Sequence, residues 1–161
     1  MIIEKATADD FKEIKKLYYN ARIFMALSQN ANQWINGYPE DEVITNDINS
    51  GNLYILKSCK KIQAAFAFIP GIDQTYNKIE GKWLSKTPYS AIHRVVSSGA
   101  ISGVTDLVFN WCKGKCLSIR IDTHEDNLVM QKAILRNNFK YCGIIFTHNG
   151  TPRLAYQWDK K

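Results

Sequence analysis

The sequence predicts a mixed α/β domain of the α+β type, with a central, mostly antiparallel sheet of about seven strands flanked by about four helices. Two observations lead to this fold class. Segments with the apolar period of a helix alternate with short segments of strand character along the whole chain. Short polar turns join neighbouring strands near the middle and at the end of the chain, which predicts antiparallel hairpins. No repeat or flexible linker divides this pattern, so we expect residues 1–161 to form a single domain.

The first half of the chain is expected to contain three strands and two helices. Phe11, Leu17 and Met25 belong to the apolar face of the first helix, and Gly51 suits the left-handed residue that ends the second. Residues 64–69 are apolar throughout, which favours a central strand covered on both faces. In order, the elements are a strand (1–5), a helix (8–28), a shorter helix (42–49) and a hairpin of strands 53–58 and 62–69.

The second half begins with a long polar and aromatic connection, residues 72–88, which suits either a substrate-facing loop or a surface excursion. Beyond it, strands and helices alternate, and the last two strands fit a hairpin. In order, the elements are a strand (91–96), a helix (104–112), a strand (117–122), a helix (127–138) and strands 139–146 and 153–158.

The composition limits the partners and the compartment. The net charge is +6, but the basic residues are scattered, which does not favour a nucleic-acid partner and suits a surface that attracts anions. No apolar run approaches the roughly 18 residues that span a bilayer, and the N-terminus lacks the order of a secretion signal, so we expect a cytoplasmic protein without a membrane partner. Cys112 and Cys116 could lie one helical turn apart, but no nearby Cys/His pair completes a metal site, so no metal is expected.

The stretch YSAIHRVVSSGAISGVTDLVFNW, residues 89–111, joins an apolar strand to a helix through a short Ser/Gly loop. The first N–H groups of a helix have no partner within the helix, and the helix dipole favours negative charge there. Glycine lets the backbone approach a ligand closely. This arrangement suits phosphate, although many such junctions bind nothing.

Three segments of the chain resemble the GNAT superfamily of acyl-CoA-dependent N-acetyltransferases, and the resemblance covers essentially the whole sequence. IHRVVSSGAISGVTDLVFNWC is similar to the fourth strand, pyrophosphate loop and third helix of that family. IDTHEDNLVMQKAILRNNFKYCG is similar to its downstream segment, with Asn127 and Phe139 matching and Asn138 in the usual glycine position. QWINGYPEDEVITNDI resembles a signature of a bacterial subgroup, which also shows runs like IRIDTH and PRLAYQ.

Two departures from the family concern the cofactor and the chemistry. The family loop, Arg/Gln-x-x-Gly-x-Gly/Ala, corresponds to residues 100–105, where only the middle glycine, Gly103, is kept. Backbone N–H groups can still hold a pyrophosphate there, and the Thr105 hydroxyl could add a donor. The tyrosine that many members place seven residues after Asn127 is replaced by Ile134.

The resemblance implies a fold, an activity and a cofactor. We expect a GNAT-like acetyltransferase domain in which an amine of a small molecule attacks acetyl-CoA directly within a ternary complex. Acetyl-CoA would be the co-substrate, and a homodimer is a possible assembly. The pantetheine would pair with main chain exposed between the fourth and fifth strands. The cofactor-binding residues would be Val95, Val96, Ser97, Ser102, Gly103, Val104, Thr105 and Asn127.

The candidates for the general base are His93, His124, Asp122 and Glu125. Histidine titrates closest to neutral pH, which suits the removal of a proton from an ammonium group. His93 lies in the strand that leads to the reaction centre, but it could equally be a satisfied strand histidine, and His124 could instead cap the next helix. Tyr141 is the nearest tyrosine that could protonate the leaving thiolate, or it is a half-buried aromatic.

The acceptor side is expected to use Trp34, Tyr38 and Arg94. The two aromatics could hold an amine by cation–π contact, or they could pin a loop to the core. Alternation along the strand places Arg94 on the opposite side from His93, as a carboxylate anchor or a surface charge. A different class of function stays open, namely a non-catalytic acyl-CoA-binding or interaction domain with a decayed pyrophosphate loop.

Overall fold

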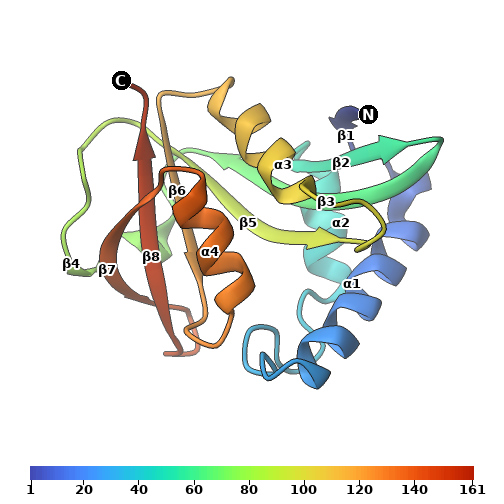
Figure 1. Cartoon of the computed structure of the whole chain (residues 1–161), viewed down its shortest axis with the longest axis horizontal. Helices are drawn as coiled ribbons and strands as arrows, with labels where there is room; N and C mark the ends of the chain where they lie inside the picture. The colour runs from blue at the N-terminus through green and yellow to red at the C-terminus, as the bar shows by residue number, and fades with distance from the viewer.

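The computed structural model describes all 161 residues and contains four α-helices and one eight-stranded sheet (Figure 1). The helices are α1 (Phe11–Leu27), α2 (Asp41–Asn49), α3 (Val104–Lys113) and α4 (Leu128–Arg136). The strands are β1 (Ile2–Lys5), β2 (Leu53–Ser58), β3 (Lys61–Pro70), β4 (Glu80–Gly81), β5 (Ser90–Ser97), β6 (Ser118–Thr123), β7 (Lys140–Phe146) and β8 (Pro152–Asp159). The predicted fold class is confirmed, and the one strand that the sequence did not predict is the two-residue β4.

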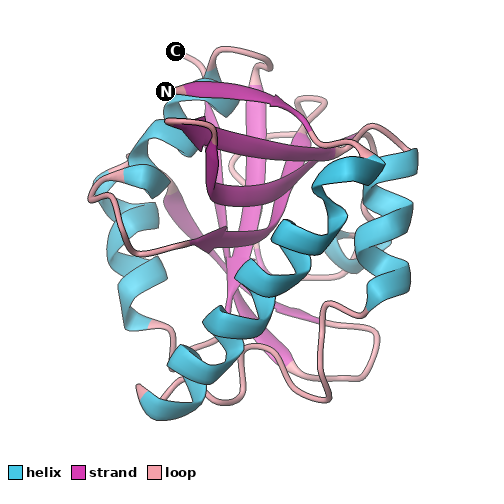
Figure 2. Ribbon diagram, turned by 90° about the vertical axis from the view of Figure 1, so that its right-hand side faces the viewer, coloured by secondary structure: helices cyan, strands magenta, loops and turns pink.

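The sheet has the order β1-β2-β3-β5-β6-β8-β7-β4 and carries two helices on each face (Figure 2). Apolar residues of α1 and α2 pack on one face, and those of α3 and α4 pack on the other. The central strand β3 serves both faces, because Phe66 and Phe68 join one cluster while Ala65 and Ala67 join the other. This confirms that the apolar run of β3 is a strand covered on both sides. None of the helices combines the length and the apolar character that crossing a membrane requires.

The strands β5 and β6 form the one parallel pair of the sheet, and they pair along only part of their length. Three residue pairs join Ser90–Ile92 to Ile119–Ile121, after which the strands diverge. Each keeps its antiparallel partner on the other side, β3 for β5 and β8 for β6. The edges that face each other beyond Ile92 therefore carry main-chain groups with no strand partner, inside the sheet rather than at its border.

A β-bulge lies in β5 just after this point of divergence. The pairing of β5 with β3 shifts between Ala65 and Ala67, and Arg94 has the left-handed backbone angle φ +55. A bulge changes the side to which the following residues point. Regular alternation would place His93 and Arg94 on opposite sides of β5. Instead, Arg94 pairs with Asp47 of α2, on the face to which Ala67, the partner of His93, also packs, and this corrects the orientation expected for Arg94.

Two residues that lack a side chain attach the 72–88 connection to the sheet. Gly81 of β4 faces Gly143 of β7, with φ values of +137 and +142. A Cβ on Gly143 would lie 2.1 Å from the Glu80 carbonyl oxygen, so the backbones approach each other more closely than any other residue allows. This attachment fixes the segment that contains Asp73 and Tyr76.

The replacement of Gly143 by alanine is expected to lower the free energy of unfolding by about 3 kcal/mol, because the methyl group must displace the backbone of Glu80. Gly71→Ala provides a matched control: its φ of +97 is also unfavourable for alanine, but no atom lies within 4 Å of the new methyl group. We expect the control to cost about 1 kcal/mol from backbone strain alone. Denaturant unfolding measures both, and equal losses would contradict a steric origin.

Candidate active site

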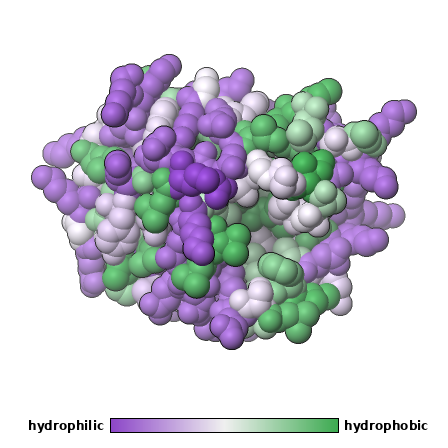
Figure 3. Space-filling model, in the orientation of Figure 1, coloured by the Kyte–Doolittle hydropathy of each residue, from purple (hydrophilic) through white to green (hydrophobic).

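A cleft of about 1150 Å³ opens where β5 and β6 diverge. Residues of α1, the loop before α2, β5, the start of α3 and the turn before α4 line it. Figure 3 shows the hollow on the same side of the molecule that Figure 1 presents. Several exposed apolar residues, including Phe24, Leu128 and Val129, surround its mouth. The lining residues come from three parts of the chain, 17–40, 69–105 and 121–153, so they are distant in sequence.

One end of the cleft has the features of an anion site. Gly103 precedes α3 with a φ of +73 and no side-chain cap, and nothing lies within 4 Å of the position of a Cβ there. The left-handed conformation, rather than a lack of space, is what favours glycine. The first helical hydrogen bond of α3 runs from the Leu107 N–H to the Gly103 carbonyl, which leaves the N–H groups of residues 104–106 outside the helical ladder. These groups suit a phosphate.

The acidic residue in the first turn of α3 is turned away from this site. The Asp106 carboxylate accepts hydrogen bonds from Arg136, at 2.8 Å, and from the side chain of Asn137. These contacts lower the pKa of Asp106 below its ordinary value, so the group is a partner of α4 and not a competitor for the helix N-terminus.

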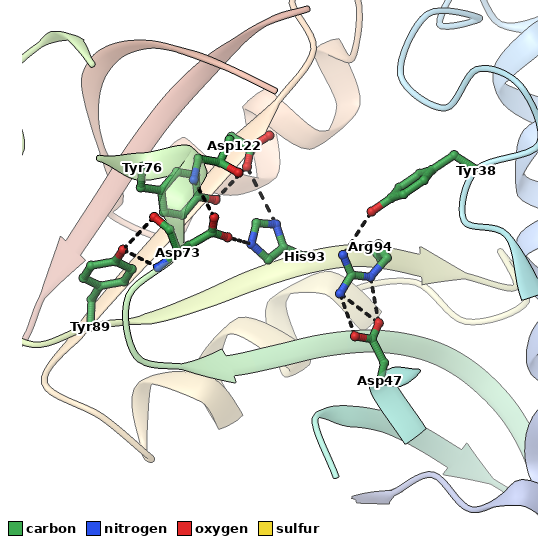
Figure 4. A network of polar contacts seen from close by, with 9 residues as sticks. Tyr38, Asp47, Asp73, Tyr76, Tyr89, His93, Arg94 and Asp122 are labelled. Atoms are coloured by element: carbon green, nitrogen blue, oxygen red, sulfur yellow. Dashed lines mark hydrogen bonds and ion pairs between the residues drawn. The ribbon is translucent and has the colours of Figure 1, made fainter. Parts of the chain in front are cut away.

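The centre of the cleft holds His93 between two carboxylates (Figure 4). Its Nε2 lies 2.7 Å from Oδ2 of Asp73, and its Nδ1 lies 3.8 Å from Oδ1 of Asp122. The Tyr76 hydroxyl donates to the same oxygen of Asp122, at 2.6 Å. If Nε2 carries the proton that Asp73 accepts, Nδ1 is left free to accept another.

Asp73 is itself fixed in position. Its Oδ1 accepts the Thr75 N–H at 2.9 Å, and its own N–H donates to the hydroxyl oxygen of Tyr89 at 2.9 Å. Burial alone would raise the pKa of this carboxyl, but the bonds from His93 and from the Thr75 N–H outweigh it and lower the pKa from 3.8 to about 2. Asp73 is therefore an ionised acceptor that orients the imidazole. Burial also raises the pKa of Tyr76, and Asp122 adds to the effect, so that hydroxyl stays a donor.

A second polar cluster holds the bulge in β5. Arg94 donates from Nε and Nη2 to the two oxygens of Asp47 in α2, at 2.8 and 2.9 Å, and from Nη1 to the Tyr38 hydroxyl at 3.0 Å. The carbonyl oxygen of Arg94 accepts the Tyr18 hydroxyl at 2.8 Å, and Tyr18 packs edge to face on Trp34. The strained backbone at Arg94 is thus held from both its main chain and its side chain.

A glutamine in the loop before α2 connects that loop to the end of β6 and to the turn before α4. Oε1 of Gln33 accepts three hydrogen bonds, from the Thr123 hydroxyl, the His124 N–H and the Asn127 side-chain amide, at 3.0, 2.9 and 3.2 Å. The Asn127 oxygen in turn caps α4 by accepting the Met130 N–H. Gln33 thereby links the N-terminal half of the chain to the turn between β6 and α4.

The structure brings most of the residues expected at the site into one cleft and leaves three outside it. The residues that line the cleft are Trp34, Tyr38, His93, Arg94, Val95, Val96, Ser97, Gly103, Val104, Thr105 and Asn127. His124, Ser102 and Tyr141 are not among its lining residues. His124 Nδ1 accepts the Asp126 N–H, so it stabilises the turn before α4. Tyr141 is 53% exposed and packs edge to face on Tyr156.

Three residues that matter to the geometry were not identified as site residues from the sequence. Asp73 lies in a connection without any regular pattern, 20 residues before the histidine it contacts, so only the fold could pair them. Asp47 and Gln33 entered the sequence analysis only as letters of the segment QWINGYPEDEVITNDI, and no role was assigned to either. Their contacts with Arg94 and with the start of α4 become visible only in the fold. No group of three or more His, Cys, Asp or Glu side chains is placed to hold a metal ion.

The interrupted parallel strand pair and the left-handed glycine before α3 fit the features that the sequence resemblance to acyl-CoA-dependent N-acetyltransferases implied. Comparison with solved structures agrees. A GNAT-family acetyltransferase from Streptococcus agalactiae matches with a TM-score of 0.87 and 30% identity, covering 99% of this chain and 95% of that one. The chain belongs to the GNAT family of acetyltransferases. No protein-family model and no curated protein matches the sequence.

Two further structures share the fold at lower identity. A GNAT superfamily phosphinothricin acetyltransferase from Sinorhizobium meliloti, in complex with AcCoA, matches with a TM-score of 0.65 and 11% identity over 98% of this chain and 87% of that one. An aminoglycoside acetyltransferase in complex with coenzyme A and kanamycin matches with a TM-score of 0.66 and 13% identity, covering 98% of this chain and 94% of that one. At such identities the likeness concerns the fold alone.

Removal of the Asp47 side chain is expected to destabilise the protein strongly, because it leaves the mostly buried Arg94 guanidinium without its carboxylate. We expect Asp47→Ala to lower the free energy of unfolding by about 3 kcal/mol or more. Asp41→Ala, in the first turn of the same helix, removes a surface ion pair with Lys15 and should cost less than about 1 kcal/mol. Urea unfolding compares the two variants; a small loss at Asp47 would contradict the structural role of the pair.

Asp73 should also contribute to the dependence of stability on pH. Its pKa is lower in the folded protein, at about 2, than the ordinary 3.8, so its stabilisation is complete only above about pH 5 and is lost progressively as the pH falls toward 2. We expect Asp73→Asn to be less stable than the wild type by roughly 2 kcal/mol at pH 7, and the gap to shrink between pH 5 and pH 3. Asp9→Asn, at an exposed residue that forms no ion pair, controls for the loss of one charge. A gap that does not change with pH would argue against an ionised Asp73 partner.

Proposed function

We propose that the protein is an N-acetyltransferase that transfers an acetyl group from acetyl-CoA to a primary amine of a small molecule, by direct attack within a ternary complex. The observation that carries the proposal is the place of His93, held by Asp73 at the point where β5 and β6 diverge. The GNAT membership supports acetyl transfer, and related structures with AcCoA or coenzyme A bound support the choice of donor.

The donor would be held mainly by main chain. The diverging edges of β5 and β6, from Val95 to Ser97 on one side and at Asp122 and Thr123 on the other, offer unpaired groups to the amides of pantetheine. The loop that includes Ser102 and Gly103, with the first N–H groups of α3, would hold the pyrophosphate. Asn127 contributes by fixing the start of α4.

The same place suits the charge that develops during acyl transfer. A main-chain N–H of Val95 or Val96, beside the bulge, would stabilise the negative charge on the thioester oxygen. Such a donor is preorganised, since Tyr18 and Asp47 hold the bulge from two sides. Trp34 and Tyr38 would form the wall against which the acceptor amine is placed.

His93 would act as the general base. An acceptor that arrives as an ammonium ion first loses one proton to solvent. As the neutral amine nitrogen bonds to the carbonyl carbon and the carbon–sulfur bond breaks, Nδ1 accepts a proton from the amine, while Nε2 keeps its own proton and donates it to ionised Asp73 in a hydrogen bond. The positive imidazolium then lies between Asp73 and Asp122. The leaving thiolate needs one proton, and His93 now carries one, so the reaction balances without a tyrosine. The position of the usual family tyrosine is the fully buried Ile134, and Tyr141 lies outside the cleft.

Calorimetry with acetyl-CoA tests the donor site. We expect saturable binding, and no saturation at millimolar concentration would overturn the proposal. A thiol-release assay over a panel of amines then tests turnover, and His93→Gln should lose about 100-fold or more in kcat while it binds acetyl-CoA as the wild type does. Unchanged turnover in this variant would remove His93 as the base. Tight binding with no turnover on any amine would favour the non-catalytic acyl-CoA-binding domain.

A further inference from the structure

Arg153 is a buried cation that the proposed chemistry does not use. It lies at the start of β8, is only 8% exposed, and lines the same cleft as His93. Its neighbours Leu154 and Tyr156 pack toward α3 and α4, so alternation places Arg153 on the opposite face together with Ala155. Ala155 is the partner of Asp122 in the β6–β8 pair. Arg153 therefore shares one face of the sheet with the carboxylates around His93.

The guanidinium of Arg153 forms no ion pair in the protein. Its guanidinium donates to the carbonyl oxygens of Gln33 and Pro152, both at 3.1 Å, and no carboxylate lies within 4.0 Å. Arg94 and Arg136, by contrast, each pair with an aspartate. Burial lowers the pKa of Arg153, and the more distant charge of Asp122 offsets this effect only in part. Such a group is costly unless something else supplies the negative charge.

We infer that the acceptor carries a carboxylate that Arg153 binds, so that the substrate class is an amino carboxylate whose amine reaches His93. This inference rests on the proposed function and specifies its acceptor. A guanidinium has five N–H donors, of which two serve the carbonyls here, and the rest suit a carboxylate. A molecule anchored at β8 and reacting at β5 spans the part of the cleft between the diverging strands.

The other charges of the cleft favour a carboxylate over a phosphate. Asp73, Asp122 and Asp126 line the cleft. Three arginines line it as well, but Arg94 and Arg136 already pair with aspartates, which leaves Arg153 as the one guanidinium without an ion pair. A phosphate monoester carries close to two negative charges at neutral pH and would be repelled more strongly than a singly charged carboxylate. The same aspartates attract the ammonium group of the acceptor, so a molecule with one charge of each sign matches both ends of this surface.

Matched acceptors test the inference. The thiol-release assay is run with L-amino acids, β-alanine and γ-aminobutyrate, each beside its carboxamide, and with spermidine and phosphoethanolamine as amines that lack a carboxylate. We expect transfer to one or more amino carboxylates, and a loss of about 30-fold in kcat/KM for the matching amide. In Arg153→Gln, kcat/KM for the amino carboxylate should fall by about the same 30-fold, and kcat/KM for the amide should change little. Arg153→Lys keeps the charge and should retain part of the activity on the carboxylate.

The ratio of kcat/KM for the carboxylate to kcat/KM for the amide separates recognition from a merely structural role. A structural role of Arg153 would lower kcat/KM for both substrates alike. Equal rates for the two, or selectivity that survives in Arg153→Gln, would overturn the inference. So would transfer to spermidine or phosphoethanolamine in preference to every amino carboxylate, although the acetyltransferase proposal would then stand.

Binding supplies a readout apart from turnover. The melting temperature is measured with coenzyme A present and the same amino carboxylates added. A rise that requires both the carboxylate and Arg153, in a protein that transfers no acetyl group, would support the recognition site and contradict the acetyltransferase. The inference fails if no amino carboxylate is acetylated and none raises the melting temperature of the wild type by more than it raises that of Arg153→Gln.

Discussion

The limited pairing of β5 with β6 is the constraint on which the rest of the site depends. Three residue pairs are enough to keep the sheet continuous, and the divergence after Ile92 opens it from within. A sheet normally leaves unpaired main-chain groups only at its borders, where water satisfies them. Here the outer partners β3 and β8 keep both strands in place while their inner edges stay free. The cleft is therefore a property of the backbone, and its donors do not depend on particular side chains.

An opening inside a sheet needs support, because the diverging strands could otherwise close on each other or separate. Tyr18 and Asp47 hold the bulge of β5 from the face of α1 and α2. Gln33 holds the end of β6 from the same half of the chain, through its three accepted hydrogen bonds. The two sides of the cleft are thus fixed by one stretch of chain, which runs from α1 through the following loop to α2. Within that loop, Gln33 and Tyr38 contribute side chains that hold β6 and the bulge of β5.

The sequence predicted the elements well because their signals are local. The apolar periods of α1, α3 and α4 and the apolar run of β3 depend only on neighbouring residues. Even one departure from the family has a local reason: Asn138 replaces glycine at a position with φ +62, a conformation that asparagine tolerates. The strand β4 was missed because two residues have no period, and its pairing depends on glycines 62 positions apart at Gly81 and Gly143.

The site was less predictable because its contacts join distant segments. Alternation along β5 separates His93 from Arg94, and only the bulge, a mismatch with β3, brings both into one cleft. The partner of His93 is Asp73, from a connection whose path the sequence does not define. Tyr141 and His124 were sound candidates by residue type, but the strand pairing of β7 leaves Tyr141 half exposed, and the turn before α4 uses His124.

The distribution of charge in the cleft follows from the same geometry. Asp73 and Asp122 approach one imidazole because β5, β6 and the 72–88 connection meet where the parallel pairing ends. His93 therefore lies between two partly buried carboxylates, next to the free main chain of β5. Under the proposed function, a proton taken from the amine would be held at this place. Arg153 lies on the same face and forms no ion pair with a carboxylate of the protein. A ligand that carries both an ammonium group and a carboxylate would therefore match the charges on both sides of the cleft.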